Sequence, residues 1–142
     1  MRTILVATDG SDASLRALDF AARQAAELAD TRLHVLYVRA QLRVYGEIEV
    51  YVGEKHMREL AMEEAAAILD AARQHLAGTV ASVELEQLEG DPGETIARRA
   101  AELRCESIVM GTHGRGRLAS AVMGSVAHRV VQLSPVPVTL TR

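Results

Sequence analysis

Short apolar segments alternate regularly with segments of helical periodicity, and this alternation limits the possible fold more than any other feature. Residues 3–7 form an unbroken apolar run that ends at Thr8-Asp9-Gly10, which is typical of a strand buried on both faces. Regular alternation of strand and helix predicts a parallel sheet, because parallel strands need a crossover between them. The expected strands are 3–7, 33–38, 80–88, 107–110 and 135–140.

These segments predict an α/β fold, an open doubly wound five-stranded parallel sheet in the order 3-2-1-4-5 with helices on both faces. Ser11 or Asp12 can cap the first helix, and Asp91 followed by Pro92 is a typical start for the third. The second helix is expected from about 55 to 77 and the fourth from about 122 to 133. The buried face of the second helix is expected to contain Met57, Ala61, Ala65, Ile68, Ala72 and Leu76.

Residues 40–54 have a different pattern, with a period of two. Ile48, Val50 and Val52 alternate with polar or aromatic neighbours, so a short strand or an ordered flap is expected there.

The last strand contains Pro135 and Pro137, which have no amide hydrogen and are found mainly in edge strands. An open edge favours pairing with a second copy, since a twofold contact is self-complementary. We therefore expect a homodimer formed through this strand, with its apolar side chains on one face: Val136, Val138 and Leu140.

The composition excludes several classes of protein. The 142 residues correspond to a single domain over 1–142, and one cysteine allows no internal disulfide. A net charge of −3 and an aromatic content of 3% argue against a nucleic-acid partner. No apolar run approaches the ~20 residues of a membrane span, and the first apolar run is too short for a signal peptide. The expected location is therefore the cytoplasm.

The predicted topology also locates a binding site. The order 3-2-1-4-5 reverses direction between the first and fourth strands, and ligands bind outside the carboxyl ends of strands at such a point. Asp9-Gly10 follows the first strand, and Gly111-Thr112-His113-Gly114 follows the fourth.

The glycine-rich segment after the fourth strand has the parts of a phosphate site. Gly111 and Gly114 let the backbone approach a ligand closely, and Gly124-Ser125 lies at a predicted helix start, where amides bind anions. Arg115 adds positive charge nearby. The alternative is a tight turn followed by a capped helix. The sequence contains neither a P-loop nor a G-x-G-x-x-G motif after the first strand.

The spacing of Gly111, Gly114 and Gly124-Ser125 resembles the ATP-binding signature of the universal stress protein family, and Asp9 and the ending 135–138 match that family too. The resemblance covers the whole chain and implies ATP as ligand, with Mg²⁺ or Mn²⁺ carried by the phosphates rather than by a protein site. It implies that the Val38 backbone meets adenine and that Asp9 meets the ribose, with Gly111 nearby. It also implies that the phosphates are held by Gly114, Gly124, Ser125 and Val126. The nucleotide-binding set is then Thr8, Asp9, Val38, Gly111, Gly114, Arg115, Gly124, Ser125 and Val126.

Three functions are compatible with this set. The leading hypothesis is an ATP-binding regulatory protein of the stress response, with hydrolysis absent or slow. The alternatives are a nucleotide-using enzyme such as a slow ATPase, and a dimeric stress protein that binds no nucleotide in the cell. His113 is either a phosphate contact, a weak base or a solvated loop residue, and Cys105 is interpreted as a small semi-buried hydrophobic residue.

Overall fold

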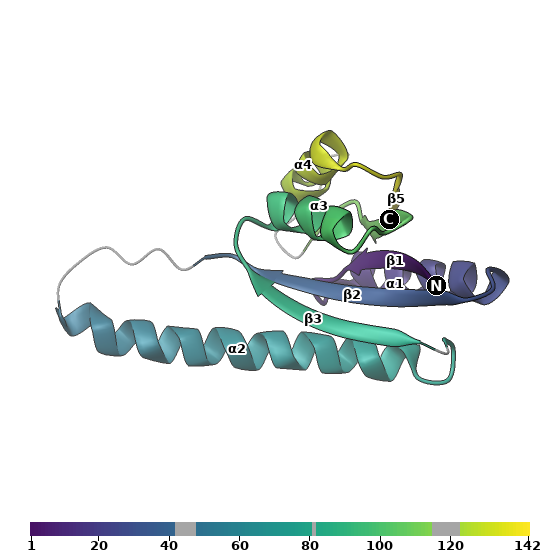
Figure 1. Cartoon of the computed structure of the whole chain (residues 1–142). Helices are drawn as coiled ribbons and strands as arrows, with labels where there is room; N and C mark the ends of the chain where they lie inside the picture. Colours follow the sequence, from purple (N-terminus) through teal and green to yellow (C-terminus); the bar gives the residue numbers. More distant parts are fainter. Residues whose placement is uncertain (42–47, 81, 115–122) are drawn as a thin grey trace.

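The computed structural model describes residues 1–41, 48–80, 82–114 and 123–142, and everything below refers to these ranges. Five parallel strands form one sheet in the order β3-β2-β1-β4-β5, as the sequence predicts (Figure 1). The strands are β1 (Arg2–Ala7), β2 (Thr31–Arg39), β3 (Val83–Glu89), β4 (Ser107–Gly111) and β5 (Val138–Thr141). The helices are α1 (Asp12–Glu27), α2 (Ile48–Leu76), α3 (Pro92–Glu102) and α4 (Ser125–Leu133).

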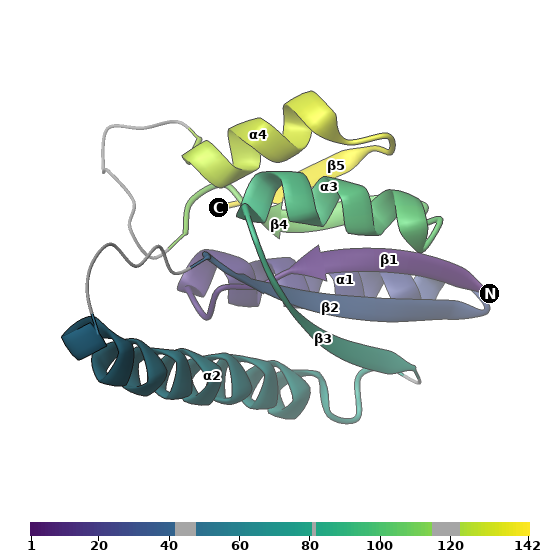
Figure 2. The same ribbon diagram turned by 60° about the vertical axis from the view of Figure 1, so that its left-hand side comes forward.

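Helices cover both faces of the sheet, which confirms the doubly wound architecture. Ile4 and Val6 of β1 pack with α1 and α2 on one face, whereas Leu5 and Ala7 pack with α3 and α4 on the other. Figures 1 and 2 show α2 on the side of the sheet opposite α3 and α4. The strand β1 is therefore buried on both faces, in agreement with its unbroken apolar sequence.

Side-chain caps start two of the helices as the sequence indicates. Ser11 is the N-cap of α1 and accepts a hydrogen bond from Ser14 N at 3.2 Å. Asp91 is the N-cap of α3 and accepts from Glu94 N at 3.0 Å, with Pro92 as the first helical residue. Both helices therefore begin next to the carboxyl end of the strand before them.

The alternating segment was misinterpreted, because Ile48–Val52 belongs to α2 and forms no strand. Adding a residue to an existing helix gains one hydrogen bond for each residue ordered, whereas a strand there needs a partner. The other residues of the expected flap include 42–47, which lie outside the described ranges. Met57 was also placed wrongly, since its side chain is 55% exposed and does not belong to the buried face of α2. The N-terminal part of α2 extends past the sheet (Figure 1).

The fourth helix begins at Ser125, not near 122, because Gly124 has an extended ψ of 163° and its N–H bonds to Thr112 O at 2.6 Å. The last strand begins at Val138 instead of 135, since neither Pro135 nor Pro137 can donate to a ladder. The pairing of β5 with β4 alone confirms that it is an edge strand.

A network of charged side chains lies between β2, β3 and α3. Glu86 of β3 lies 2.7 Å from Nε2 of the buried His34 and accepts from Arg99 Nε at 2.8 Å. Burial alone raises the pKa of Glu86, but the hydrogen bonds from Arg99 and His34 outweigh it and hold that pKa below its ordinary value. The ionised carboxylate is therefore the form that stabilises the fold.

This network makes stability depend on pH. Glu86→Gln should lower the free energy of unfolding by about 1.5–3 kcal/mol at pH 7, the range for a hydrogen bond to a charged group. A carboxylate whose pKa is lowered by folding stabilises the protein at pH values above its unfolded-state pKa of ~4.3. This stabilisation is lost as the pH falls through the folded-state pKa. In urea unfolding, the difference between wild type and variant should therefore shrink below about pH 4.3.

Glu84→Gln is the matched control on the same strand, because the Glu84 side chain is 51% exposed and should contribute under about 1 kcal/mol. If the difference in free energy of unfolding between wild type and Glu86→Gln stays constant down to pH 3, the stabilising role of the Glu86 carboxylate is contradicted. The carboxylate would then not titrate in that pH range.

Candidate functional site

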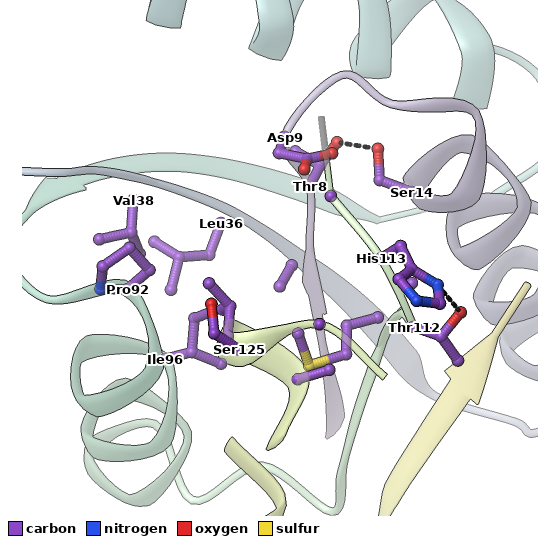
Figure 3. Close-up of a pocket in the computed structure, with 17 residues that line it drawn as sticks. Thr8, Asp9, Ser14, Leu36, Val38, Pro92, Ile96, Thr112, His113 and Ser125 are labelled. Atoms are coloured by element: carbon purple, nitrogen blue, oxygen red, sulfur yellow. Dashed lines mark hydrogen bonds between the residues drawn. The ribbon is translucent and has the colours of Figure 1, made fainter. Parts of the chain in front are cut away.

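A cavity of about 290 Å³ opens at the carboxyl ends of β1 and β4, at the predicted reversal of strand order. Figure 3 shows the residues that line it. Eight of the nine residues predicted from the sequence are among them: Thr8, Asp9, Val38, Gly111, Gly114, Gly124, Ser125 and Val126. The ninth, Arg115, lies outside the described residues.

One end of the cavity is apolar. Leu36 and Val38 come from β2, Pro92 and Ile96 come from the first turns of α3, and Ala127 comes from α4. In Figure 3 the labelled side chains of β2 and α3 lie together on one side, away from His113 and Thr112. These walls form a slot suited to a flat, apolar group.

The backbone of Val38 adds polar groups to this slot. Successive residues of a strand direct their N–H and C=O groups to opposite neighbours. Leu36 O accepts from Thr8 N on the β1 side at 3.0 Å, and Arg39 O accepts from Gly90 N on the β3 side at 2.9 Å. The N–H and C=O of Val38 therefore point to the β1 side, where β1 has already ended at Ala7. They provide one donor and one acceptor next to each other at the cavity wall.

Asp9 lines the cavity two residues after the end of β1. Its Oδ1 accepts from Ser11 N at 2.9 Å, so the carboxylate holds the turn into α1. Its Oδ2 lies against Gly114, where an added Cβ would clash with that oxygen. Asp9 thus stabilises a turn and also lines the cavity, and Gly114 lets the two loops approach this closely.

The start of α4 forms a further part of the cavity wall, and Figure 3 shows Ser125 beside Ile96 of the slot. Gly124 is its N-cap and supplies no side-chain hydrogen bond, so among the described residues α4 lacks the side-chain cap that α1 and α3 have. Ser125 and Val126 of the first turn line the cavity. Amides at a helix start carry partial positive charge, so this part of the cavity wall is suited to an anion.

Sequence reasoning did not predict several of the lining residues. Thr8 donates to the buried Ser14 at 3.2 Å, and Ser14 lines the cavity from the first turn of α1. The sequence could have indicated this, because Ser14 lies three residues after the capping serine of a helix that starts at the carboxyl edge of the sheet. The remaining lining residues were not predicted, because the packing of their strands and helices decides which side chains reach the cavity. They are Ala7, Leu36, Pro92, Ile96, Met110, Thr112 and Ala127.

The two side chains with possible chemical reactivity, His113 and Cys105, lie in different places. His113 lines the cavity, and its Nδ1 is 3.1 Å from Thr112 Oγ1. Cys105 is buried on the α3 side of the sheet, and burial raises its pKa to about 11, so its thiol stays protonated near neutral pH. In the described ranges, no group of three or more His, Cys, Asp or Glu side chains is placed to hold a metal ion.

Comparison with known proteins identifies the family. The family model described as "Universal stress protein family" matches residues 1–142. The chain belongs to the universal stress protein family. The resemblance seen in the glycine pattern is therefore confirmed.

Individual relatives of this universal stress protein agree with the family model. It is 35% identical to universal stress protein YxiE of Bacillus subtilis, over 98% of this chain and 97% of that one. The solved structure of universal stress protein UspA from Lactobacillus plantarum has a TM-score of 0.85 and 28% identity, covering 99% of this chain and 97% of that one.

A second solved structure contains a nucleotide. It is the universal stress protein from Archaeoglobus fulgidus in complex with dAMP, with a TM-score of 0.72 and 25% identity over 100% of this chain and 98% of that one. Within the described residues of this chain, none of the helices is long and apolar enough to cross a membrane.

The close approach of Gly111 to α1 beside the cavity gives a test of the geometry. A Cβ added at Gly111 would lie 2.8 Å from Ala13 Cβ and 3.1 Å from the carbonyl carbon of Ala13, so α1 would have to shift. Gly111→Ala should lower the free energy of unfolding by about 1–3 kcal/mol, the usual range for overpacking. The measurement is urea unfolding followed by circular dichroism.

Gly53→Ala is the matched control, because Gly53 lies in α2 and an added Cβ there has no neighbour within 4 Å. That variant should be slightly more stable than wild type, by about 0.5–1 kcal/mol, since alanine favours a helix over glycine. Equal stability of Gly111→Ala and wild type would show that α1 does not press on the end of β4.

Proposed function

We propose that this universal stress protein is a cytoplasmic regulatory protein of the stress response that binds ATP in the cavity between β1 and β4. The observation that carries the proposal is the combination of chemical groups around one cavity. An apolar slot with a backbone donor and acceptor, a carboxylate and an uncapped helix start all line it. These groups complement a base, a ribose and phosphates.

The slot favours adenine among the bases. Adenine has an acceptor at N1 beside the donor N6, and the N–H and C=O of Val38 are arranged to pair with both. Guanine has a donor at N1 and an acceptor at O6, so the same backbone groups would oppose it. The dAMP-bound relative from Archaeoglobus fulgidus supports an adenine nucleotide as the class of ligand.

The carboxylate and the helix start divide the rest of the nucleotide between them. Asp9 can accept hydrogen bonds from ribose hydroxyls, and a charged acceptor contributes about 1.5–3 kcal/mol. Phosphates fit the start of α4, where Ser125 adds a hydroxyl and the helix dipole favours negative charge. We propose that Gly111 lies near the ribose, that Gly114, Gly124, Ser125 and Val126 hold the phosphates with Thr8 and Arg115 nearby, and that Mg²⁺ or Mn²⁺ arrives on the phosphates.

The decisive experiment identifies and ranks the ligands. Protein purified without added nucleotide is denatured, and the released small molecules are identified by mass spectrometry. Stripped protein is then titrated with ATP, adenosine and GTP in a calorimeter. We expect ATP to bind at least tenfold more tightly than GTP, a difference of about 1.4 kcal/mol. Binding of neither ATP nor adenosine refutes the proposal and favours the stress protein without nucleotide.

Gly124→Val separates the phosphate end from the base end. The φ of −68° is allowed for valine, but a Cβ at this position lies 3.2 Å from Thr112 O and 3.6 Å from His113 Cα, so the 112–114 segment must move. ATP affinity should fall at least tenfold, about 1.4 kcal/mol, while adenosine affinity falls much less. Calorimetry with both ligands measures this, and Gly53→Val on the open part of α2 is the control. Unchanged ATP affinity would place the phosphates elsewhere.

We further propose that two copies pair through β5. Pro137 O and Thr141 O accept from β4, at 2.9 Å from Ile108 N and 2.7 Å from Thr112 N. By alternation, the N–H and C=O of Val138 and Leu140 point to the open edge. The apolar side chains on β5 and just before it (Val136, Val138 and Leu140) pack partly against the core, so the backbone edge is what remains for a second copy.

Val138→Pro tests this pairing. Proline there removes an amide that faces outward, a change that edge strands tolerate, so the fold should persist while a dimer dissociates. Light scattering should report the mass of a monomer for the variant and the mass of a dimer for wild type and for the control Val138→Ala. A dimer that survives Val138→Pro, with an unchanged circular dichroism spectrum, would move the interface to another surface.

A further inference from the structure

The end of β5 contacts the outer side of the cavity wall. Thr141 Oγ1 donates to Ala13 O at 3.1 Å and lies 3.4 Å from Met110 O. The backbone oxygen of Thr141 accepts from Thr112 N at 2.7 Å. One residue of the edge strand therefore contacts α1, the end of β4 and the segment that follows β4.

These contacts join two separate walls of the cavity. Ala13 precedes the lining residue Ser14, in the first turn of α1, which follows the turn held by Asp9. Thr112 lines the cavity itself, and its own oxygen accepts from Gly124 N at 2.6 Å at the start of α4. Figure 2 shows the C-terminus at the edge of the sheet to which the strand arrows point, which is the edge with the cavity.

The sheet itself does not require a hydroxyl at this position. The ladder between β4 and β5 uses backbone groups only, with Thr141 opposite Gly111. The Thr141 hydroxyl reaches the helix carbonyl of Ala13 at 3.1 Å and lies at the longer distance of 3.4 Å from the β4 carbonyl of Met110. Loss of this hydroxyl would remove the hydrogen bond from a half-buried contact between α1 and β5. The backbone ladder between β4 and β5 would stay intact.

We propose that Thr141 is a positioning residue of the ligand site, which sets the spacing between the Asp9 turn and the Gly111–Gly114 segment. The inference rests on the proposed binding of ATP. A ligand that contacts both walls depends on their spacing, because hydrogen bonds weaken steeply outside their narrow range of length and angle. A ligand that contacts only the Asp9 turn and the apolar slot depends on it much less.

The test compares two substitutions at one position. Thr141→Val removes the hydroxyl and keeps the shape, and Thr141→Ser keeps the hydroxyl. Thr139→Val is the control, since it makes the same change two residues earlier on β5. ATP and adenosine affinities are measured by calorimetry, and the midpoint of thermal unfolding is measured without ligand.

We expect Thr141→Val to weaken ATP binding by about fivefold, about 1 kcal/mol, with adenosine binding within about twofold of wild type. Thr141→Ser and Thr139→Val should bind both ligands as wild type does. Wild-type ATP affinity in Thr141→Val overturns the inference, as does an equal loss in Thr141→Ser. Equal losses of ATP and adenosine with a lower unfolding midpoint would show a purely structural role and also overturn it. A wild-type protein that binds no adenine nucleotide refutes the proposed function itself, which distinguishes that failure from these.

Discussion

The cavity depends on a difference in length between two neighbouring strands. β1 ends at Ala7, opposite Leu36, while β2 continues to Arg39. Because β1 turns away at Thr8 and β4 begins the other half of the sheet, Val38 has backbone groups on the β1 side with no strand to pair with. The reversal of strand order therefore creates the space and also supplies polar groups at its wall.

Glycine allows the walls of this cavity to approach each other. Gly111 lies against Ala13, and Gly114 lies against Asp9. Gly93 of α3 lies so close to α4 that an added Cβ would be 2.6 Å from Arg129 Cβ, which brings the two helices of that face together beside the slot. Each contact is made by residues far apart in the sequence, so each glycine serves a tertiary approach and not a local turn.

Polar contacts on both sides of the cavity connect it to the rest of the fold. On one side, Glu86 joins His34 of β2 to Arg99 of α3, and α3 supplies Pro92 and Ile96 to the slot. On the other side, Thr141 joins α1 to the end of β4. The two edge strands β3 and β5 thus each contribute a side chain that holds an element of the site in place, although neither is among the strands that line it.

The sequence by itself determined the order of the elements, the strand order and the caps at Ser11 and Asp91, because periodicity and capping are local signals. Eight described lining residues were expected from the strand ends, the glycine spacing and the family resemblance that this spacing carries. It did not determine where α2 begins, since a five-residue alternation suits a strand and a helix alike until neighbours are known. Only the tertiary structure decided that Pro92 and Ile96 complete the slot and that Thr141 contacts both walls. These features depend on strand register and on the distance between packed helices, which are properties of residue pairs remote in sequence.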